Sequence, residues 1–402
     1  MKKTIQLLTV GTFVGFLGFM GYQTVTKEPT AYSEYEYRNL SQRPNLTVDT
    51  LASGDYMKEF ETYFQDQFYK RIGISKYFYA LQIELNKPVV SNVLIGKDGW
   101  ASYVPGFARS EVQINQTIEE TKKLNDFALA NEIPLYLSIN PHKDYTLAHV
   151  FPYHPASFRG PETKREVIEG LDEKIQIIDN PAYFKDTFSH EELETMFYKT
   201  DHHWNYLGAY EAYKHVIHFL RERHEGIPAP AEKEQLKTLS ADRENVYFIG
   251  STNRSVLRAL NEKEEAVSAF TVPDQDVFSE IYSIDNFGKE AEGFESVFHT
   301  NVDSATQTYG GLTSGDFAQI VMKTKTPPNN YKVLVIKDSY TNAMFPYMAT
   351  HFAETHILDM RHYKERSVED YVKEHNINMI ILSHNETMVG DTFKYSGNLA
   401  SN

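Results

Sequence analysis

A short run of the sequence, Asp201-His202-His203-Trp204, carries side chains that could perform acid–base chemistry. Asp201 and His203 are two residues apart, so in an extended segment both side chains leave the backbone on the same side. A neutral histidine can act as a base when a carboxylate fixes its tautomer. A helix cap beside an imidazole gives the same pattern. Metal-dependent phosphoesterases share it too, but no accompanying Asp-x-Asp pair stands out, so no metal site is expected.

A serine at the end of an apolar run is the second candidate. The run Tyr331–Ile336 predicts a strand, and Ser339 follows it where a helix is expected to begin. Open α/β sheets place their sites at such strand ends, and helix N–H groups there stabilise negative charge. The Gly-x-Ser-x-Gly pattern is missing, and serine is also a favoured N-cap residue. The sequence has no cysteine to compete as nucleophile, so Ser339, His203 and Asp201 supply the members of a hydrolase-type triad.

The elements around these residues alternate between strands and helices. Apolar runs predict strands at Leu135–Ile139, Lys174–Ile178, Tyr331–Ile336, Thr355–Met360 and Ile377–Leu382. Helical periodicity predicts helices at Glu111–Asn131, Glu162–Glu173, Tyr206–Glu222, Thr341–His351 and Ser367–Glu374. This rhythm indicates an α/β fold, with a parallel sheet covered by helices on both faces. Residues 228–328 are less regular and are expected to form an insertion with short strands and long loops.

The first part of the chain predicts a membrane segment. After Lys2 and Lys3, an apolar run of about 18 residues is just long enough to span a bilayer as a helix. The basic end should stay in the cytoplasm, so the rest of the chain should lie outside. No convincing cleavage site follows, which favours an uncleaved signal anchor over a cleaved signal peptide. We expect an anchor at 1–26, a spacer at 27–54 and one α/β domain at 55–402.

Charge and cysteine content narrow the function. Lys and Arg total 40 against 55 Asp and Glu, a formal net charge of -15. This charge repels polyanions and argues against nucleic-acid binding. The absence of cysteine excludes thiolate metal sites, iron–sulfur clusters and cysteine nucleophiles. It also suits an exported protein.

The motifs together resemble the DHHW protein family, relatives of the alginate O-acetyltransferases with an SGNH-hydrolase-like domain. The Asp201–Trp204 motif is followed by Asn205 and Gly208, as in that family. Further similar segments are 36–40, 64–68, 95–100, 140–143, 335–339 and 358–361. The resemblance covers the chain from about residue 35 to residue 385. It implies an SGNH-hydrolase-like (flavodoxin-like) parallel sheet, preceded by one transmembrane helix.

Carried onto this sequence, the resemblance makes Ser339 the nucleophile, His203 the base and Asp201 the orienting carboxylate. One position departs from the pattern. Lys337 stands two residues before the serine, where SGNH enzymes and many relatives carry glycine. Its side chain is expected to narrow or charge the site.

Other residues are candidates for substrate binding or for stabilising an oxyanion. The N–H of Ser339 or Tyr340 could donate at the helix start. The turn that begins with Gly250 and Ser251 allows a close backbone approach, and its Arg254 could hold an anionic or sugar group. Lys143 follows another strand and could face the site. Asn385 could supply the polar side-chain donor that SGNH enzymes use. A further candidate loop is 309–312.

The predicted activity is O-acetylation of a cell-surface or secreted polysaccharide through an acyl-serine, without a cofactor. Acetyl-coenzyme A is not expected outside the membrane. The resemblance therefore implies a membrane-bound O-acyltransferase partner that passes acyl groups across the bilayer. Two alternatives stay open: a carbohydrate esterase of the same fold, and a non-catalytic polysaccharide-binding or assembly protein whose triad has decayed.

Overall fold

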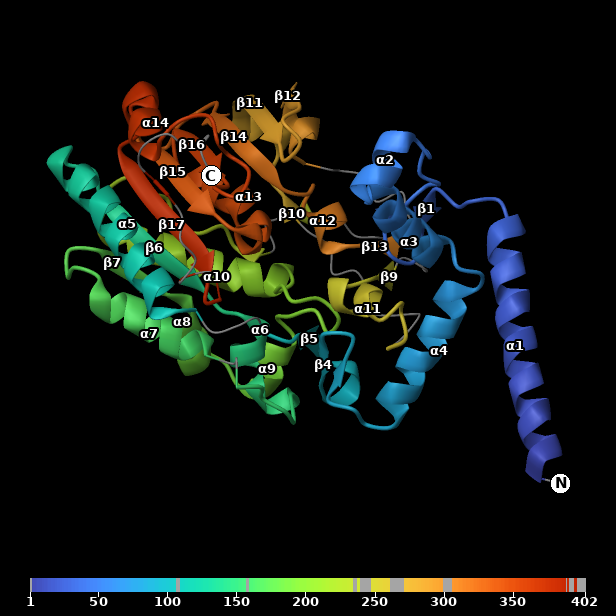
Figure 1. Cartoon of the computed structure of the whole chain (residues 1–402). Helices are drawn as coiled ribbons and strands as arrows, with labels where there is room; N and C mark the ends of the chain where they lie inside the picture. The colour runs from blue at the N-terminus through green and yellow to red at the C-terminus, as the bar shows by residue number, and fades with distance from the viewer. Residues whose placement is uncertain are drawn as a thin grey trace. The chain divides into compact units, whose positions relative to one another are not determined.

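The computed structural model describes residues 2–105, 109–156, 159–233, 237–238, 247–260, 271–298, 306–387, 389 and 394–395. The chain forms two compact units (Figure 1). The first is Met1–Val93 with Asn253–Glu262, and the second is Leu94–Thr252 with Lys263–Asn402. The bounds expected for the anchor, the spacer and the α/β domain stay predictions.

The first unit is mainly helical. Its elements are α1 (Lys2–Thr26), β1 (Tyr32–Ser33), β2 (Arg38–Asn39), α2 (Val48–Ser53), α3 (Asp55–Gln67), α4 (Arg71–Glu84) and β3 (Val89–Val90). The two longer helices after Gly54 are α3 and α4. They are separated at Lys70, which adopts a left-handed backbone conformation with φ 54°. The expected spacer carries two short strands and α2.

Ion pairs between segments far apart in sequence hold this unit together. Arg38 donates to both carboxylate oxygens of Asp66, at 2.5 and 2.9 Å, and lowers the pKa of Asp66 to about 2. Arg71 makes a matching pair with Glu36. Two-pronged pairs of this kind are directional as well as strong. The Arg38–Asp66 pair joins segments 36–40 and 64–68.

The second unit is built on an eight-stranded sheet. Its order is β12 (Glu290–Glu292), β11 (Phe278–Asp285), β14 (Phe317–Thr324), β16 (Glu354–Leu358), β15 (Lys332–Lys337), β17 (Met379–Asn385), β6 (Leu135–Asn140) and β7 (Gln176–Asp179). The five strands from β16 to β7 pair in parallel. The remaining three join antiparallel at one edge. The predicted α/β fold with its parallel sheet is confirmed.

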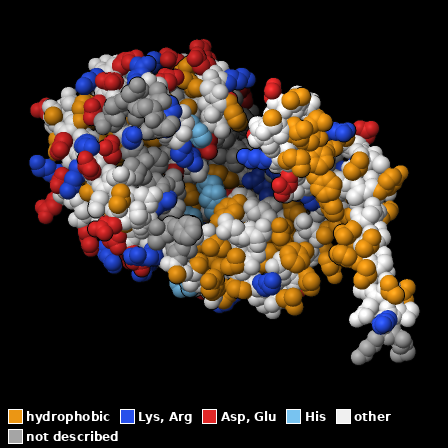
Figure 2. Space-filling model, in the orientation of Figure 1, with side chains coloured by type: hydrophobic (Ala, Val, Ile, Leu, Met, Phe, Trp, Pro, Cys, Tyr) orange, Lys and Arg blue, Asp and Glu red, His pale blue; other side chains and the backbone are white. Residues whose placement is uncertain are grey.

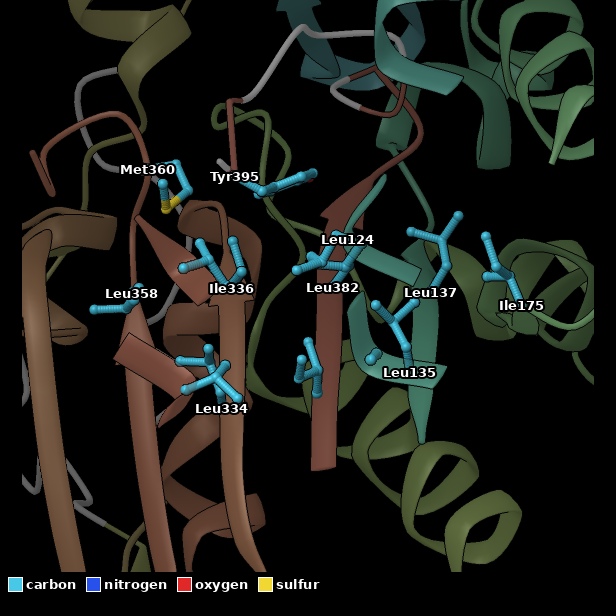
Figure 3. Close-up of a cluster of buried hydrophobic side chains, with 14 of the residues drawn as sticks. Leu124, Leu135, Leu137, Ile175, Leu334, Ile336, Leu358, Met360, Leu382 and Tyr395 are labelled. Carbon is cyan, nitrogen blue, oxygen red and sulfur yellow. The ribbon is translucent and has the colours of Figure 1, made fainter. Parts of the chain in front are cut away.

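Helices cover both faces of the sheet. The α-helices that follow β5 in the chain are α5 (Glu111–Ala130), α6 (Lys143–Thr146), α7 (Gly160–Gly170), α8 (Asn180–Thr187), α9 (His190–Glu194), α10 (Tyr206–Arg221), α11 (Ser251–Ser255), α12 (Tyr309–Leu312), α13 (Phe345–Met348) and α14 (Val368–His375). Alternate strand residues, among them Leu135, Leu137, Leu334, Ile336 and Leu382, pack with α5, α7 and α14 (Figure 3). A second group of helices includes α8, which contacts β6, and α10, which contacts both α8 and α13.

Smaller elements complete the second unit. They are β4 (Val93–Ile95), β5 (Ala101–Tyr103), β8 (Lys237–Thr238), β9 (Tyr247–Phe248), β10 (Thr271–Val272) and β13 (Thr306–Gln307). The Asp98-Gly99 turn lies between β4 and β5.

Three predictions differ from the structure. The helix expected at Thr341–His351 is broken into a 3₁₀ turn, Ser339–Ala343, then α13 and a second 3₁₀ turn. Pro346 has no N–H to continue the first turn and instead lies at the start of α13. The irregular region 228–328 contains β11 and β14, which have eight residues each and extend the sheet. The strand predicted at Lys174–Ile178 begins two residues later, at Gln176.

The sheet also explains the position of the candidate residues. In parallel strands the carboxyl ends lie at one edge. Ser339 follows β15, Lys143 follows β6, and Asn385 ends β17, which lies between them. The fold therefore brings these three distant parts of the sequence to the same edge.

Candidate active site

Ser339, His203 and Asp201 form a continuous hydrogen-bond chain. The Ser339 Oγ lies 2.8 Å from His203 Nε2, and His203 Nδ1 lies 2.7 Å from Asp201 Oδ1. Asp201 and His203 are buried, whereas Ser339 is half-buried. This is the geometry that allows an imidazole to take a serine proton while a carboxylate fixes its tautomer.

The Asp201 carboxylate is held by further donors. Its Oδ2 accepts from the Ser251 N–H at 2.7 Å, and its Oδ1 also accepts from the His203 N–H at 3.1 Å. Burial alone would raise the pKa of Asp201. The hydrogen bonds and the neighbouring imidazoles outweigh burial, so the pKa lies well below its usual range. Asp201 is therefore an anion that accepts the Nδ1 proton of His203.

Gly250 and Ser251 support this carboxylate. The Gly250 Cα lies against the Thr200 backbone, where an added Cβ would come within 1.8 Å of the Thr200 carbonyl oxygen. The Thr252 N–H and hydroxyl donate to that same oxygen. The close approach expected of Gly250 is present, but it brings the Ser251 N–H to Asp201 instead of to an oxyanion. The sequence did not predict that the Ser251 N–H donates to this carboxylate.

Tyr309 is a second contributor whose role the sequence did not reveal. Its ring stacks on the His203 imidazole, with centroids 3.7 Å apart and an interplanar angle of 5°. Its hydroxyl donates to the Ser339 carbonyl oxygen at 2.9 Å. Tyr309 thus fixes the plane of the base and the backbone of the serine together. The only sequence signal was the Tyr-Gly-Gly turn at a candidate loop.

The turn that carries Ser339 uses two of the expected oxyanion donors for itself. Asp338 accepts from the Tyr340 N–H at 2.9 Å and from the Asn385 side-chain amide at 2.6 Å. These bonds cap the 3₁₀ turn and join it to the end of β17. Within the described part of the chain, the Ser339 N–H makes no hydrogen bond, so it is the backbone donor left at this turn.

Trp204 and Tyr340 lock the motif onto that turn. The fully buried Trp204 donates its indole N–H to the Tyr340 carbonyl oxygen at 2.9 Å. The Tyr340 hydroxyl donates back to the His202 carbonyl oxygen. The tryptophan of the motif therefore holds the base-bearing segment against the nucleophile-bearing turn.

Lys143 does not face the site as expected. Its buried ammonium donates to the backbone carbonyl oxygens of Ala101, Tyr198, Lys199 and Asp201. The partners are backbone atoms from separate segments, so no side-chain pattern in the sequence could indicate them. Lys143 fixes the backbone from which Asp201 projects.

The Lys143→Met variant is expected to lose about 3 kcal/mol of unfolding free energy, because several buried carbonyl groups lose a charged donor. Denaturant unfolding measures this loss. The matched control is Lys123→Met on α5, where the side chain is 49% exposed and the change should stay within about 0.5 kcal/mol. Equal effects of the two variants would contradict the bridging role of Lys143.

Lys337 does not narrow or charge the site, as its position in the sequence had suggested. Its buried Nζ lies 2.6 Å from Asn342 Oδ1 and 3.1 Å from Asp359 Oδ2. Arg361 pairs with the same Asp359 carboxylate, and the two cations help to keep the pKa of Asp359 well below its usual range despite burial. Lys337 therefore ties the turn after β15 to the end of β16, and its charge is neutralised there.

Arg254 belongs to the first unit, where its guanidinium lies 5.3 Å from the centroid of the Tyr37 ring. This geometry is a cation–π contact. Its predicted role in holding an anionic or sugar group stays a prediction.

Asp201, His202 and His203 could also offer three metal-ligand atoms, which lie within 4.8 Å of one another. A divalent ion and the triad would use the same atoms. Asp201 Oδ1 and His203 Nδ1 already face each other in a hydrogen bond. Binding of a metal here would therefore break the chain to Ser339.

A cavity of about 480 Å³ adjoins the triad through His202. The His202 ring lines the cavity and lies 3.9 Å from the His203 ring, centroid to centroid. Aromatic and charged side chains form the wall, among them Tyr103, Tyr145, Asp144, Glu386, Arg109 and Arg159. Burial raises the pKa of Asp144 to about 6 and that of Glu386 to about 7. Near neutral pH each carboxyl group can accept a hydrogen bond from a ligand hydroxyl when it is ionised, and can donate one when it is protonated.

Known proteins resemble this chain in sequence and in fold. Residues 93–276 match the family model of the SGNH hydrolase-like domain of the acetyltransferase AlgX. PatB1 of Bacillus cereus superposes with a TM-score of 0.66 and 25% identity over 76% of this chain and 99% of that chain. PatB1 with a sulfonyl adduct gives a TM-score of 0.67 and 24% identity over 76% and 98%.

A DHHW family protein from Eubacterium siraeum superposes with a TM-score of 0.55 and 20% identity, over 77% of this chain and 94% of that chain. No curated protein matches the sequence. The predicted resemblance and the SGNH-hydrolase-like fold are confirmed. Over residues 93–276 the chain resembles an acetyltransferase domain of the SGNH hydrolase-like type, in agreement with the predicted acyltransferase or esterase.

Proposed function

We propose that this protein is a membrane-anchored, extracytoplasmic O-acetyltransferase that modifies a cell-surface or secreted polysaccharide through an acetyl-serine. The hydrogen-bond chain from Ser339 through His203 to Asp201 is the observation that carries the proposal. The match to an acetyltransferase domain favours acetyl as the transferred group. The intact geometry speaks against a decayed triad.

In the proposed first step, His203 Nε2 takes the proton of Ser339 Oγ as this oxygen attacks the acetyl carbonyl carbon. The negative charge on the carbonyl oxygen is stabilised by the Ser339 N–H. The carbon–oxygen bond to the donor then breaks, and the leaving alcohol takes the proton from His203. The product is an acetyl ester on Ser339, with the triad neutral again except for Asp201.

In the second step an acceptor hydroxyl gives its proton to His203 and attacks the acetyl ester. Collapse of the intermediate returns the proton to Ser339 Oγ and leaves the acetyl group on the acceptor. The cavity beside His202 is the proposed place for the acceptor sugar. Sugar rings stack on aromatic faces such as those of Tyr103 and Tyr145, and Asp144 can take a hydrogen bond from a sugar hydroxyl.

The proposed location rests on α1. Residues Lys3–Thr26 form a helix long and apolar enough to cross a membrane, and the basic residues at its start favour a cytoplasmic N-terminus. With the enzyme outside, the acetyl donor is proposed to come from a membrane-bound O-acyltransferase partner. No cofactor is needed in this scheme.

Transfer and hydrolysis are separated by supplying an activated acetyl ester together with an oligosaccharide. Mass spectrometry of the products is expected to find acetylated oligosaccharide formed faster than free acetate. Release of acetate with an unmodified acceptor would favour the esterase alternative. Chelator serves as a control: activity lost with chelator and restored by a divalent ion would contradict the serine mechanism.

A further inference from the structure

One helix of the first unit exposes a row of large apolar side chains. On α4 and just after it, Ile74, Tyr77, Phe78, Leu81 and Leu85 are between 40% and 73% exposed. Their spacing places them on one face of a helix. Figure 2 shows the hydrophobic side chains gathered over this part of the chain. A contiguous apolar surface of this kind marks a binding face.

The helix α1 is fixed at the point where α4 begins. Near the end of α1, the Thr24 hydroxyl accepts a hydrogen bond from the Tyr69 N–H at 3.0 Å. Phe19 meets the Tyr69 ring edge-on, with centroids 6.3 Å apart. Met20 and Thr24 are buried, while most other apolar side chains of α1 are exposed. The last turns of α1 and the first turn of α4 are therefore held together.

This attachment sets the level of α4 in the membrane. The 24-residue span Lys3–Thr26 of α1 extends about 36 Å as a helix, which slightly exceeds the hydrocarbon thickness of about 30 Å. The end of α1 must then emerge at the outer surface of the bilayer. Tyr69 is bonded there, so α4 starts within a few residues of the lipid headgroups.

The charge of α4 fits the same location. Residues 70–85 contain three basic side chains, Lys70, Arg71 and Lys76, and one acidic side chain, Glu84. The segment carries a net charge of +2 within a chain of net charge -15, although Arg71 is already paired with Glu36. Basic residues beside an apolar helix face are typical of helices that lie in the surface of an anionic bilayer.

We infer that α4 is a second membrane contact, whose Ile74–Leu85 face meets the lipids of the outer leaflet. The inference depends on α1 spanning the bilayer, and it is independent of the reaction at Ser339. A helix held at the surface in this way would limit how freely the first unit tilts about the anchor.

Fluorescence quenching by lipid tests the inference on the full-length chain. The native tryptophans, Trp100 and Trp204, are buried, so a new tryptophan on α4 reports its own surroundings. Phe78→Trp and Leu81→Trp are placed in nanodiscs that contain anionic lipids, with or without bromine on the acyl chains. The matched control is Phe287→Trp, at a phenylalanine that is 89% exposed.

Both α4 variants are expected to lose about half of their added emission to brominated lipid, because the apolar face of an interfacial helix reaches the acyl chains. Phe287→Trp should lose little. Quenching on α4 no greater than that of Phe287→Trp would overturn the inference, and the face would then be assigned to a protein partner. Thermal unfolding of each variant confirms that the added tryptophan reports on a folded chain.

Discussion

The Ser339→Ala variant is expected to lower the rate of acetyl transfer by at least about 10⁴-fold. The hydroxyl is the atom that forms the ester bond, and no other described side chain within reach of His203 Nε2 replaces it. The Ser339 N–H and the Asp338 cap are backbone or neighbouring groups that the substitution leaves in place. The loss should therefore appear in kcat, with little change in unfolding temperature.

The measurement is the initial rate of transfer from an activated acetyl ester to an oligosaccharide. Ser279→Ala, at an exposed serine on β11, is the matched control and should retain full activity. A residual rate in Ser339→Ala within about tenfold of the parent would argue against a serine nucleophile.

The Asp201→Asn variant is expected to lower kcat by about 10³- to 10⁴-fold while the fold persists. Asp201 accepts hydrogen bonds on both oxygens, from His203 at Oδ1 and from Ser251 at Oδ2. An asparagine supplies only one acceptor, so one of these donors must face the NH₂ group. If His203 faces it, Nδ1 becomes the acceptor and Nε2 carries the proton, and His203 cannot take the serine proton.

The pH-rate profile distinguishes this cause from simple misfolding. The loss should persist across the neutral range, because asparagine cannot be ionised to restore the acceptor. Asp172→Asn, at a carboxylate that is 49% exposed, is the matched control and should behave as the parent enzyme. Comparable losses in the two variants would contradict the orienting role of Asp201.

The sequence predicted the parallel core of the fold because its strands are short apolar runs between clear helical segments. The strand that leads to Ser339 and the strand that leads to Asn140 are both of this kind. The antiparallel strands β11 and β14 were missed; in β11 the adjacent polar residues Ser279 and Glu280 interrupt the apolar residues. The sequence predicted one helix at Thr341–His351, although Pro346 within it favours the break that the structure shows.

The candidate triad could be predicted because Asp201 and His203 share one short motif and Ser339 directly follows a clear apolar strand. Its supports could not. Lys143 binds backbone carbonyls, Ser251 acts through its N–H, and Tyr309 acts through a ring stacked on His203. Such contacts depend on how separate segments pack together, and the type of a residue does not indicate which backbone group it will bind.

Mass spectrometry after an acid quench tests directly whether Ser339 carries the acetyl group during the reaction. Full-length protein is mixed with an activated acetyl ester, quenched in acid within milliseconds to seconds, digested and analysed by mass spectrometry. One acetyl group is expected on the peptide that contains Ser339, and it should disappear when an oligosaccharide acceptor is added. An acetyl group on another residue, or turnover without any acetylated peptide at Ser339, would contradict the acetyl-serine mechanism.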